Sequence, residues 1–104
     1  MELSRMIVIR RTMMGMSRND LVTATGLSYP YVAELEKGSK EPSMATLRAL
    51  STGLRFVDVR AMFAWGDMLA DFIDAYPAVS IEMQRATGAT GGVIDITPAD
   101  VSFV

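Results

Sequence analysis

The side chains best suited to recognition chemistry lie in residues 28–37, where two tyrosines, a proline and two glutamates alternate with apolar positions. Tyr29 can hydrogen-bond a phosphate or pack its ring against a methyl group. Glu34 can accept a hydrogen bond from an amino group. These are the contacts by which proteins read the edges of nucleic-acid bases. A short helix that keeps such groups on its outer surface is unusual for a purely structural element.

The local signals place these residues on the second of two short helices. Ser17 with Asp20 forms a capping-box-like pair that starts the first helix, and Gly26 closes it. Ser28 caps the second helix, and Pro30 falls in its first turn, where a missing N–H costs nothing. Two helices joined by a tight turn predict a helix-turn-helix, which presents its second helix to the major groove of DNA.

Helical spacing separates an inner from an outer face in this pair. Leu21, Val32 and Leu35 point inward. The remaining side chains of the second helix lie on the outer surface. They are Tyr29, Pro30, Tyr31, Glu34 and Lys37. The alternative is that the tyrosines pack against a neighbouring helix, and the pattern alone leaves both readings open.

Three further helices are predicted in the first 64 residues, over 3–14, 43–53 and 57–64. Glycines at 15, 38 and 53 end helices. With the two helices above they make a compact all-α bundle of five helices. Other side chains are expected to face inward from the remaining helices and turns. They are Leu3, Met6, Ile7, Met13, Met14, Leu21, Val22, Ala24, Leu27, Met44, Leu47, Ala49, Leu50, Leu54, Val57, Ala61 and Met62.

The chain changes character after residue 64, so we divide it into a DNA-binding domain at 1–64 and a C-terminal segment at 65–104. A sixth helix over 66–75 places three aspartates on one face and apolar residues on the other. The apolar face either pairs with a second copy or another partner, or completes the monomer core. Its residues are Trp65, Met68, Leu69, Phe72, Ile73 and Tyr76. The end of the chain, 93–104, is a short β-hairpin, the start of a helix at Thr97, or a partly disordered tail.

The net charge of −2 hides an asymmetry between these two parts. Residues 1–64 carry nine Lys or Arg and six acids, a balance of +3. Residues 65–104 carry one Arg and six acids, a balance of −5. A basic face in the first part is suited to phosphates, although the same split also fits ordinary solvated surface.

Composition excludes several classes of function. The chain has no cysteine and no histidine, which rules out disulfides, Cys/His metal sites, Cys nucleophiles and His acid–base chemistry. Asp67, Asp71 and Asp74 have the spacing of a solvated helix face rather than of a metal site. The apolar run at 6–9 is too short for a signal peptide or a membrane span. We expect no enzyme activity, no metal or other cofactor, no membrane attachment, and a location in the bacterial cytoplasm or nucleoid.

Residues 5–58 resemble the Cro/lambda-repressor-type (XRE) helix-turn-helix family. The matching pieces are MGMS at 14–17, DLVTATGLS at 20–28, VAELEKG at 32–38 and EPSMATLRALSTGL at 41–54. The resemblance implies a lambda-repressor-like fold for just over half of the chain, with double-stranded DNA as the partner.

The resemblance also implies residue roles. It assigns base reading to Ser28, Tyr29, Pro30 and Glu34, and phosphate contacts to Arg10, Arg11, Arg18, Tyr31, Lys37, Lys40, Ser43 and Met44. Arg11 and Glu36 match a structural ion pair. Two positions depart from the family pattern. Arg18 stands where a glutamine is usual, and Pro30 stands where a polar residue is common.

The function implied is sequence-specific transcriptional regulation. We expect a repressor that occludes a promoter, of the phage-immunity or prophage type, acting as a homodimer on an operator without a small-molecule effector. The alternative is an antitoxin-type protein that binds its own operator and neutralises a toxin through its C-terminal segment.

Overall fold

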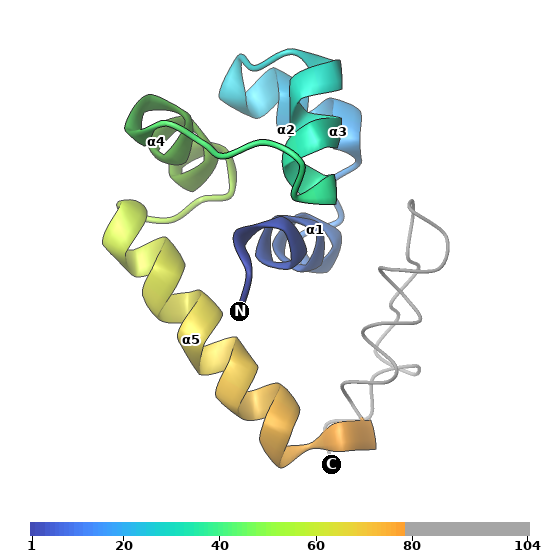
Figure 1. Cartoon of the computed structure of the whole chain (residues 1–104), viewed down its shortest axis with the longest axis vertical. Helices are drawn as coiled ribbons and strands as arrows, with labels where there is room; N and C mark the ends of the chain where they lie inside the picture. The colour runs from blue at the N-terminus through green and yellow to red at the C-terminus, as the bar shows by residue number, and fades with distance from the viewer. Residues whose placement is uncertain (79–104) are drawn as a thin grey trace.

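The computed structural model describes residues 1–78, and this part of the chain forms five α-helices. The helices are α1 (Leu3–Met13), α2 (Arg18–Thr25), α3 (Tyr29–Lys37), α4 (Met44–Gly53) and α5 (Val59–Ala75). Figure 1 shows α1 in the middle of the molecule, with α2, α3 and α4 at one end and α5 running towards the other. The expected all-α helix-turn-helix fold is confirmed. The hairpin, helix-start and tail expectations for 93–104 lie outside the described residues.

Side-chain caps start four of the helices where the sequence predicts them or close by. The hydroxyls of Ser17, Ser28 and Ser43 each accept a hydrogen bond from the backbone N–H three residues on, at 3.0, 3.2 and 3.2 Å. Asp20 completes the capping box by accepting from the Ser17 N–H at 2.8 Å. Asp58 caps α5 in the same way. These caps use amides that have no partner inside their helix.

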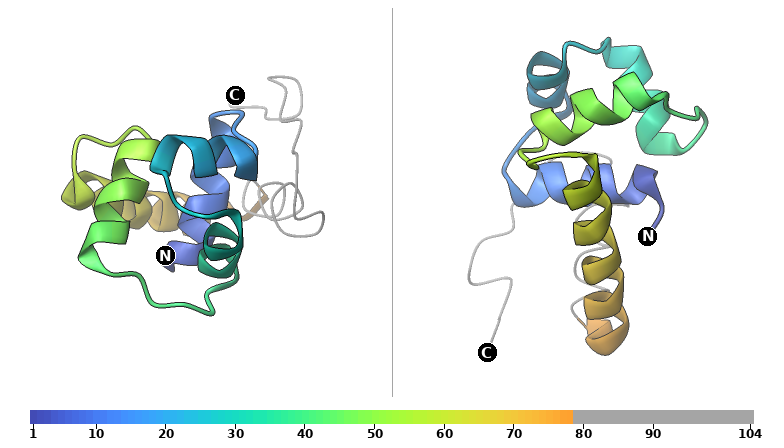
Figure 2. Two further views of the ribbon diagram at one scale, coloured as in Figure 1. Left: turned by 90° about the horizontal axis from the view of Figure 1, so that it is seen from above. Right: turned by 90° about the vertical axis from the view of Figure 1, so that its left-hand side faces the viewer.

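A single apolar core joins all five helices, and the views in Figure 2 show α5 packed beside α1 and α4. Each helix contributes at least one fully enclosed side chain. The core residues are Met6, Ile7, Leu21, Val32, Leu35, Leu50, Leu54 and Met62. Leu27, in the turn between α2 and α3, packs against this cluster.

Several residues expected in the core lie outside it. Val57 is 90% exposed because α5 starts at Val59, two residues later than predicted. Met44 and Met13 are also more than half exposed, and Ala24 is exposed. The inward face of α4 instead carries the polar Thr46, which can be buried because its hydroxyl is hydrogen-bonded.

The helices predicted at 57–64 and 66–75 form one continuous helix, α5. Gly66 lies inside it rather than at a break. An added Cβ there would stand 2.6 Å from the Met6 sulfur, so α1 and α5 approach each other closely at this point. Packing against α1 therefore offsets the weak helix preference of glycine.

Candidate nucleic-acid interface

The outward face of α3 carries the side chains predicted to read bases. Tyr29 is 44% exposed and Pro30 is exposed at the second helical position. The Glu34 side chain is partly open, and Lys37 is exposed at the last turn. The Ser28 hydroxyl already accepts a hydrogen bond from the Tyr31 N–H as a cap, which leaves its own proton and one lone pair for a further contact.

Glu34 has a cation beside it. The Lys40 Nζ lies 3.9 Å from a Glu34 carboxylate oxygen, and both side chains are about half exposed. An open pair of this kind contributes little to stability, about 0–1 kcal/mol. Lys40 places a positive charge beside the Glu34 carboxylate and so partly offsets its negative charge at this surface.

Tyr31 connects α3 to α4 rather than standing free beside Tyr29. Its hydroxyl lies 3.0 Å from the Thr46 hydroxyl, which in turn accepts a hydrogen bond from Ser43 at 3.1 Å. Of the two readings of the tyrosines, packing against a neighbouring helix therefore applies to Tyr31 and exposure applies to Tyr29. The sequence analysis did not include Thr46 among the site residues. Its position three residues after the Ser43 cap indicated that its backbone N–H would bond the Ser43 hydroxyl and bring the two side chains together.

The start of α4 lies next to this hydroxyl chain. Ser43 and Met44 are exposed there, and first-turn amides of a helix have no carbonyl partner within it. The Tyr31 contact thereby ties this helix start to α3. A hydrogen bond thus links the two predicted contact regions, α3 and the start of α4.

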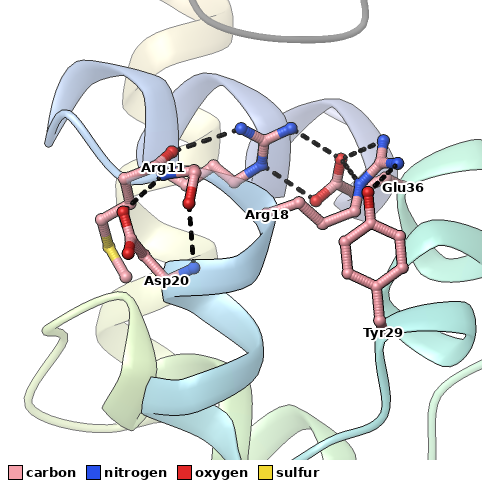
Figure 3. A network of polar contacts seen from close by, with 7 residues as sticks. Arg11, Arg18, Asp20, Tyr29 and Glu36 are labelled. Atoms are coloured by element: carbon pink, nitrogen blue, oxygen red, sulfur yellow. Dashed lines mark hydrogen bonds and ion pairs between the residues drawn. The ribbon is translucent and has the colours of Figure 1, made fainter.

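A buried carboxylate holds the helix-turn-helix to α1 (Figure 3). The two oxygens of Glu36 accept from Arg11 Nε and Nη2, both at 2.9 Å, and both side chains are 3% exposed. The third side of the Arg11 guanidinium donates to the Met16 carbonyl at 3.3 Å. All three nitrogens of the Arg11 guanidinium thus have a partner inside the protein, and the buried side chain forms the predicted ion pair with Glu36.

Arg18 shares the same carboxylate. Its Nη2 and Nε donate to Glu36 Oε1 at 3.0 and 3.2 Å, and its guanidinium lies over the Tyr29 ring. Burial lowers the pKa of Arg18, but hydrogen bonds and charge attraction from Glu36 and Tyr29 outweigh it, and the pKa lies above its ordinary value. The predicted phosphate contact of Arg18 therefore has to share this side chain with two protein partners.

Arg10 points to the opposite side of α1. Its Nε donates to the Leu54 carbonyl at 3.0 Å, and its guanidinium carbon lies 4.1 Å from the centroid of the Phe56 ring and 5.2 Å from that of Trp65. Burial lowers the pKa of Arg10. The structure gives Arg10 a packing role between α1, α4 and α5, and its predicted phosphate contact stays a prediction.

The apolar face of α5 is divided between core and surface. Leu69 is 7% exposed, and Trp65 packs on Phe56 with ring centroids 5.6 Å apart. Met68 and Tyr76 are 61% and 55% exposed. Phe72 stacks on Tyr76 and, like Ile73, is half-buried.

Among residues 1–78, no group of acidic side chains is arranged to hold a metal ion. None of the helices in this part of the chain is long and apolar enough to cross a membrane.

The fold and the outward α3 define a helix-turn-helix protein. A family model described as helix-turn-helix matches residues 7–60, more than half of the chain, and the chain belongs to this family. No curated protein and no solved structure matches the chain. The protein is therefore a DNA-binding transcriptional regulator of the XRE type.

Proposed function

We propose that the protein is a repressor that binds an operator overlapping a promoter and blocks RNA polymerase by occlusion. The observation that carries the proposal is the outward face of α3, where Tyr29, Pro30 and Glu34 are open on a helix held to α1 by the buried Glu36. Occlusion needs nothing beyond tight, specific binding, and a reading surface that is ordered before DNA binds favours such binding. The role fits a phage-type immunity repressor or a prophage regulator in the bacterial cytoplasm.

Base reading is assigned to three side chains with different chemistry. The Tyr29 ring and Pro30 offer apolar contact to a thymine methyl, and Glu34 accepts from the amino group of cytosine. Because an acid repels phosphates, Glu34 penalises sequences that lack a cytosine opposite it. Lys37, Lys40 and the first amides of α4 supply the phosphate contacts.

We also propose that two copies bind together. The exposed Met68 and Tyr76 leave apolar surface on α5 that a second copy would cover. A two-fold dimer places two copies of α3 about one DNA turn apart, roughly 34–36 Å, and its operator is then palindromic. Sedimentation as a monomer together with a single non-palindromic site would contradict this.

The direct test starts with selection of binding sites from random double-stranded DNA. The selected site is then placed across a promoter and, separately, well upstream of it, and transcription is measured in vitro. We expect strong inhibition only in the overlapping position. Inhibition in neither position, or stimulation from upstream, would contradict repression by occlusion.

The role of Glu34 is tested with a charge-matched pair. Glu34→Gln removes the acid from the reading face, and Glu41→Gln removes the same charge from the exposed loop before α4. We expect the first variant to lose its preference for cytosine at one position, by about 1–3 kcal/mol, and the second to select the wild-type site. An unchanged base preference in Glu34→Gln would remove Glu34 from the reading set.

A second candidate function is favoured by the same open part of α5. Met68 on α5 and Tyr76 at its C-cap are exposed, and Asp67, Asp71 and Asp74 are exposed on the same helix, so α5 offers both apolar and acidic groups to solvent. An antitoxin would use it to bind a basic toxin while α3 binds the operator. A one-to-one complex with a co-expressed basic neighbour, lost in Met68→Asp but kept in Arg60→Gln, would favour this function over the dimer.

A further inference from the structure

The Glu36 carboxylate serves two arginines that lie in different surroundings. The Arg11 side chain is 3% exposed and the Arg18 side chain is 24% exposed. Arg11 fills the interior side and needs no further partner. Arg18 stands at the first position of α2, between the buried carboxylate and the solvent. Two guanidiniums share one carboxylate, so the cluster has a net charge of +1. Of the two arginines, Arg18 is the one that is partly exposed to solvent.

The outer side of Arg18 is directed at the first residue of the reading helix. Its guanidinium carbon lies 5.6 Å from the centroid of the Tyr29 ring, and its Nη1 lies 3.5 Å from the Tyr29 hydroxyl. Figure 3 shows the ring standing beside the guanidinium, with the hydroxyl turned towards it. The structure therefore connects α1 to Tyr29 through Arg11, Glu36 and Arg18 in turn.

This connection needs the shape of an arginine. The planar guanidinium presents donors along two edges and a flat face, so Arg18 can bond Glu36 with one edge and meet an aromatic ring with the rest. A glutamine has one uncharged amide, so it can supply neither charge-assisted hydrogen bonds to Glu36 nor a cation against the ring. A lysine keeps the charge but lacks the fork and the flat face.

We propose that Arg18 is a positioning residue for base recognition: it holds the Tyr29 ring in one orientation and so sets the base preference at the pair that Tyr29 faces. The proposal rests on the proposed reading role of Tyr29. An exposed tyrosine without such a partner has to be ordered when DNA binds, and ordering a side chain weakens binding. With Arg18 in place the ring is ordered before DNA arrives.

A measurement without DNA tests the first half of the proposal. In protein labelled with ¹³C on the tyrosine rings, Arg18→Gln should move the Tyr29 ring signals towards those of a free ring. The signals of Tyr31 and Tyr76 should stay in place, which shows that the fold is intact. Arg60→Gln, which removes an exposed arginine from α5, serves as the control. Tyr29 signals that stay unmoved in Arg18→Gln would overturn the proposal.

Binding-site selection tests the second half. We expect Arg18→Gln and Arg18→Lys to relax discrimination at one base pair by about three- to tenfold, with the other positions retained. Tyr29→Ala should relax the same pair, and the double variant should lose nothing more there. This lack of additivity is the sign of one residue acting through the other.

The opposing results are distinct. If Arg18 is only a phosphate contact, Arg18→Gln weakens binding equally for all sequences and lowers the salt slope by about 1, which overturns positioning but leaves the proposed function standing. If wild-type protein selects no sequence at all, the proposed function itself fails.

Discussion

Arg10 and Arg11 are neighbours on α1, yet they hold two different regions of the molecule. Arg11 points into the helix-turn-helix and is held by the buried Glu36 carboxylate. Arg10 points to the junction of α4 and α5 and is held by the Leu54 carbonyl and the face of the Phe56 ring. One cation is fixed by a charge and the other by neutral groups.

This difference predicts how each region tolerates change. A buried ion pair has strict geometry, and removing one member leaves an uncompensated charge inside the protein. Contacts of a cation with aromatic faces and carbonyls contribute less than a buried ion pair, and they tolerate small shifts in geometry better. The region that orients α3 is therefore the less tolerant one, and the junction with α5 is the more adaptable one.

Removing the shared acid should have the largest effect. Glu36→Gln leaves the buried Arg11 without its counter-charge, and we expect the free energy of unfolding to fall by about 3–5 kcal/mol. Urea denaturation measures it. Glu41→Gln, an exposed acid in the next loop, should change it by less than about 0.5 kcal/mol. A loss of under about 1 kcal/mol in Glu36→Gln would mean that the two regions do not differ in this way.

A glycine-to-alanine substitution can be made in each region, at Gly53 on the helix-turn-helix side and at Gly66 on the α5 side. A Cβ on Gly53 would stand 2.6 Å from Thr25 Cγ2, where α4 meets α2, and one on Gly66 would stand 2.6 Å from Met6 Sδ, where α5 meets α1. Threonine is stiff, whereas methionine adapts. Thermal unfolding should show Gly53→Ala destabilised by about 1–3 kcal/mol and Gly66→Ala by less. The reverse order would contradict the comparison.

Replacing Arg10 probes the adaptable region. Arg10→Leu removes the Leu54 hydrogen bond and the aromatic contacts, and should lower the free energy of unfolding by about 1–2 kcal/mol. The salt dependence of DNA binding should keep its slope. Lys37→Gln should instead reduce that slope by about 1, because Lys37 is assigned to a phosphate. A reduced slope in Arg10→Leu would confirm its predicted phosphate contact.

The smallest effect is expected at the link between α3 and α4. Tyr31→Phe removes the hydrogen bond to Thr46 and should cost about 0.5–1.5 kcal/mol in denaturant unfolding. Tyr76→Phe, at an exposed position on the far end of the molecule, should cost nothing measurable. Equal losses in the two variants would show that the hydroxyl of Tyr31 contributes nothing.

The helix ends that the sequence predicted correctly depend on hydrogen bonds and backbone conformations within a few residues. A serine three residues before its capped amide and a glycine in the left-handed conformation act within one turn of helix. Ser17, Ser28, Gly26 and Gly38 therefore mark their helix ends without reference to the rest of the fold. The helix-turn-helix was predictable for this reason.

The errors arose where distant contacts decide. Gly66 indicates a break when only helix preference is considered, but its closeness to Met6 makes it part of a packed interface. At the site, the family pattern marks position 18 as a departure, with an arginine where a glutamine is usual. The bonds of Arg18 to Glu36 and Tyr29 were not predictable, because they depend on how α2 and α3 lie in space.

Because α5 is one continuous helix, its two ends are held in a fixed relation to each other. Its 17 residues span about 25 Å without a hinge, so its far end keeps a fixed rotational phase relative to the DNA-binding end. One inserted residue would turn everything beyond it by about 100°. If two copies pair through that end, the length and pitch of α5 set the distance between the two DNA-binding ends. The dimer would then bind operators of one half-site spacing and discriminate against other spacings.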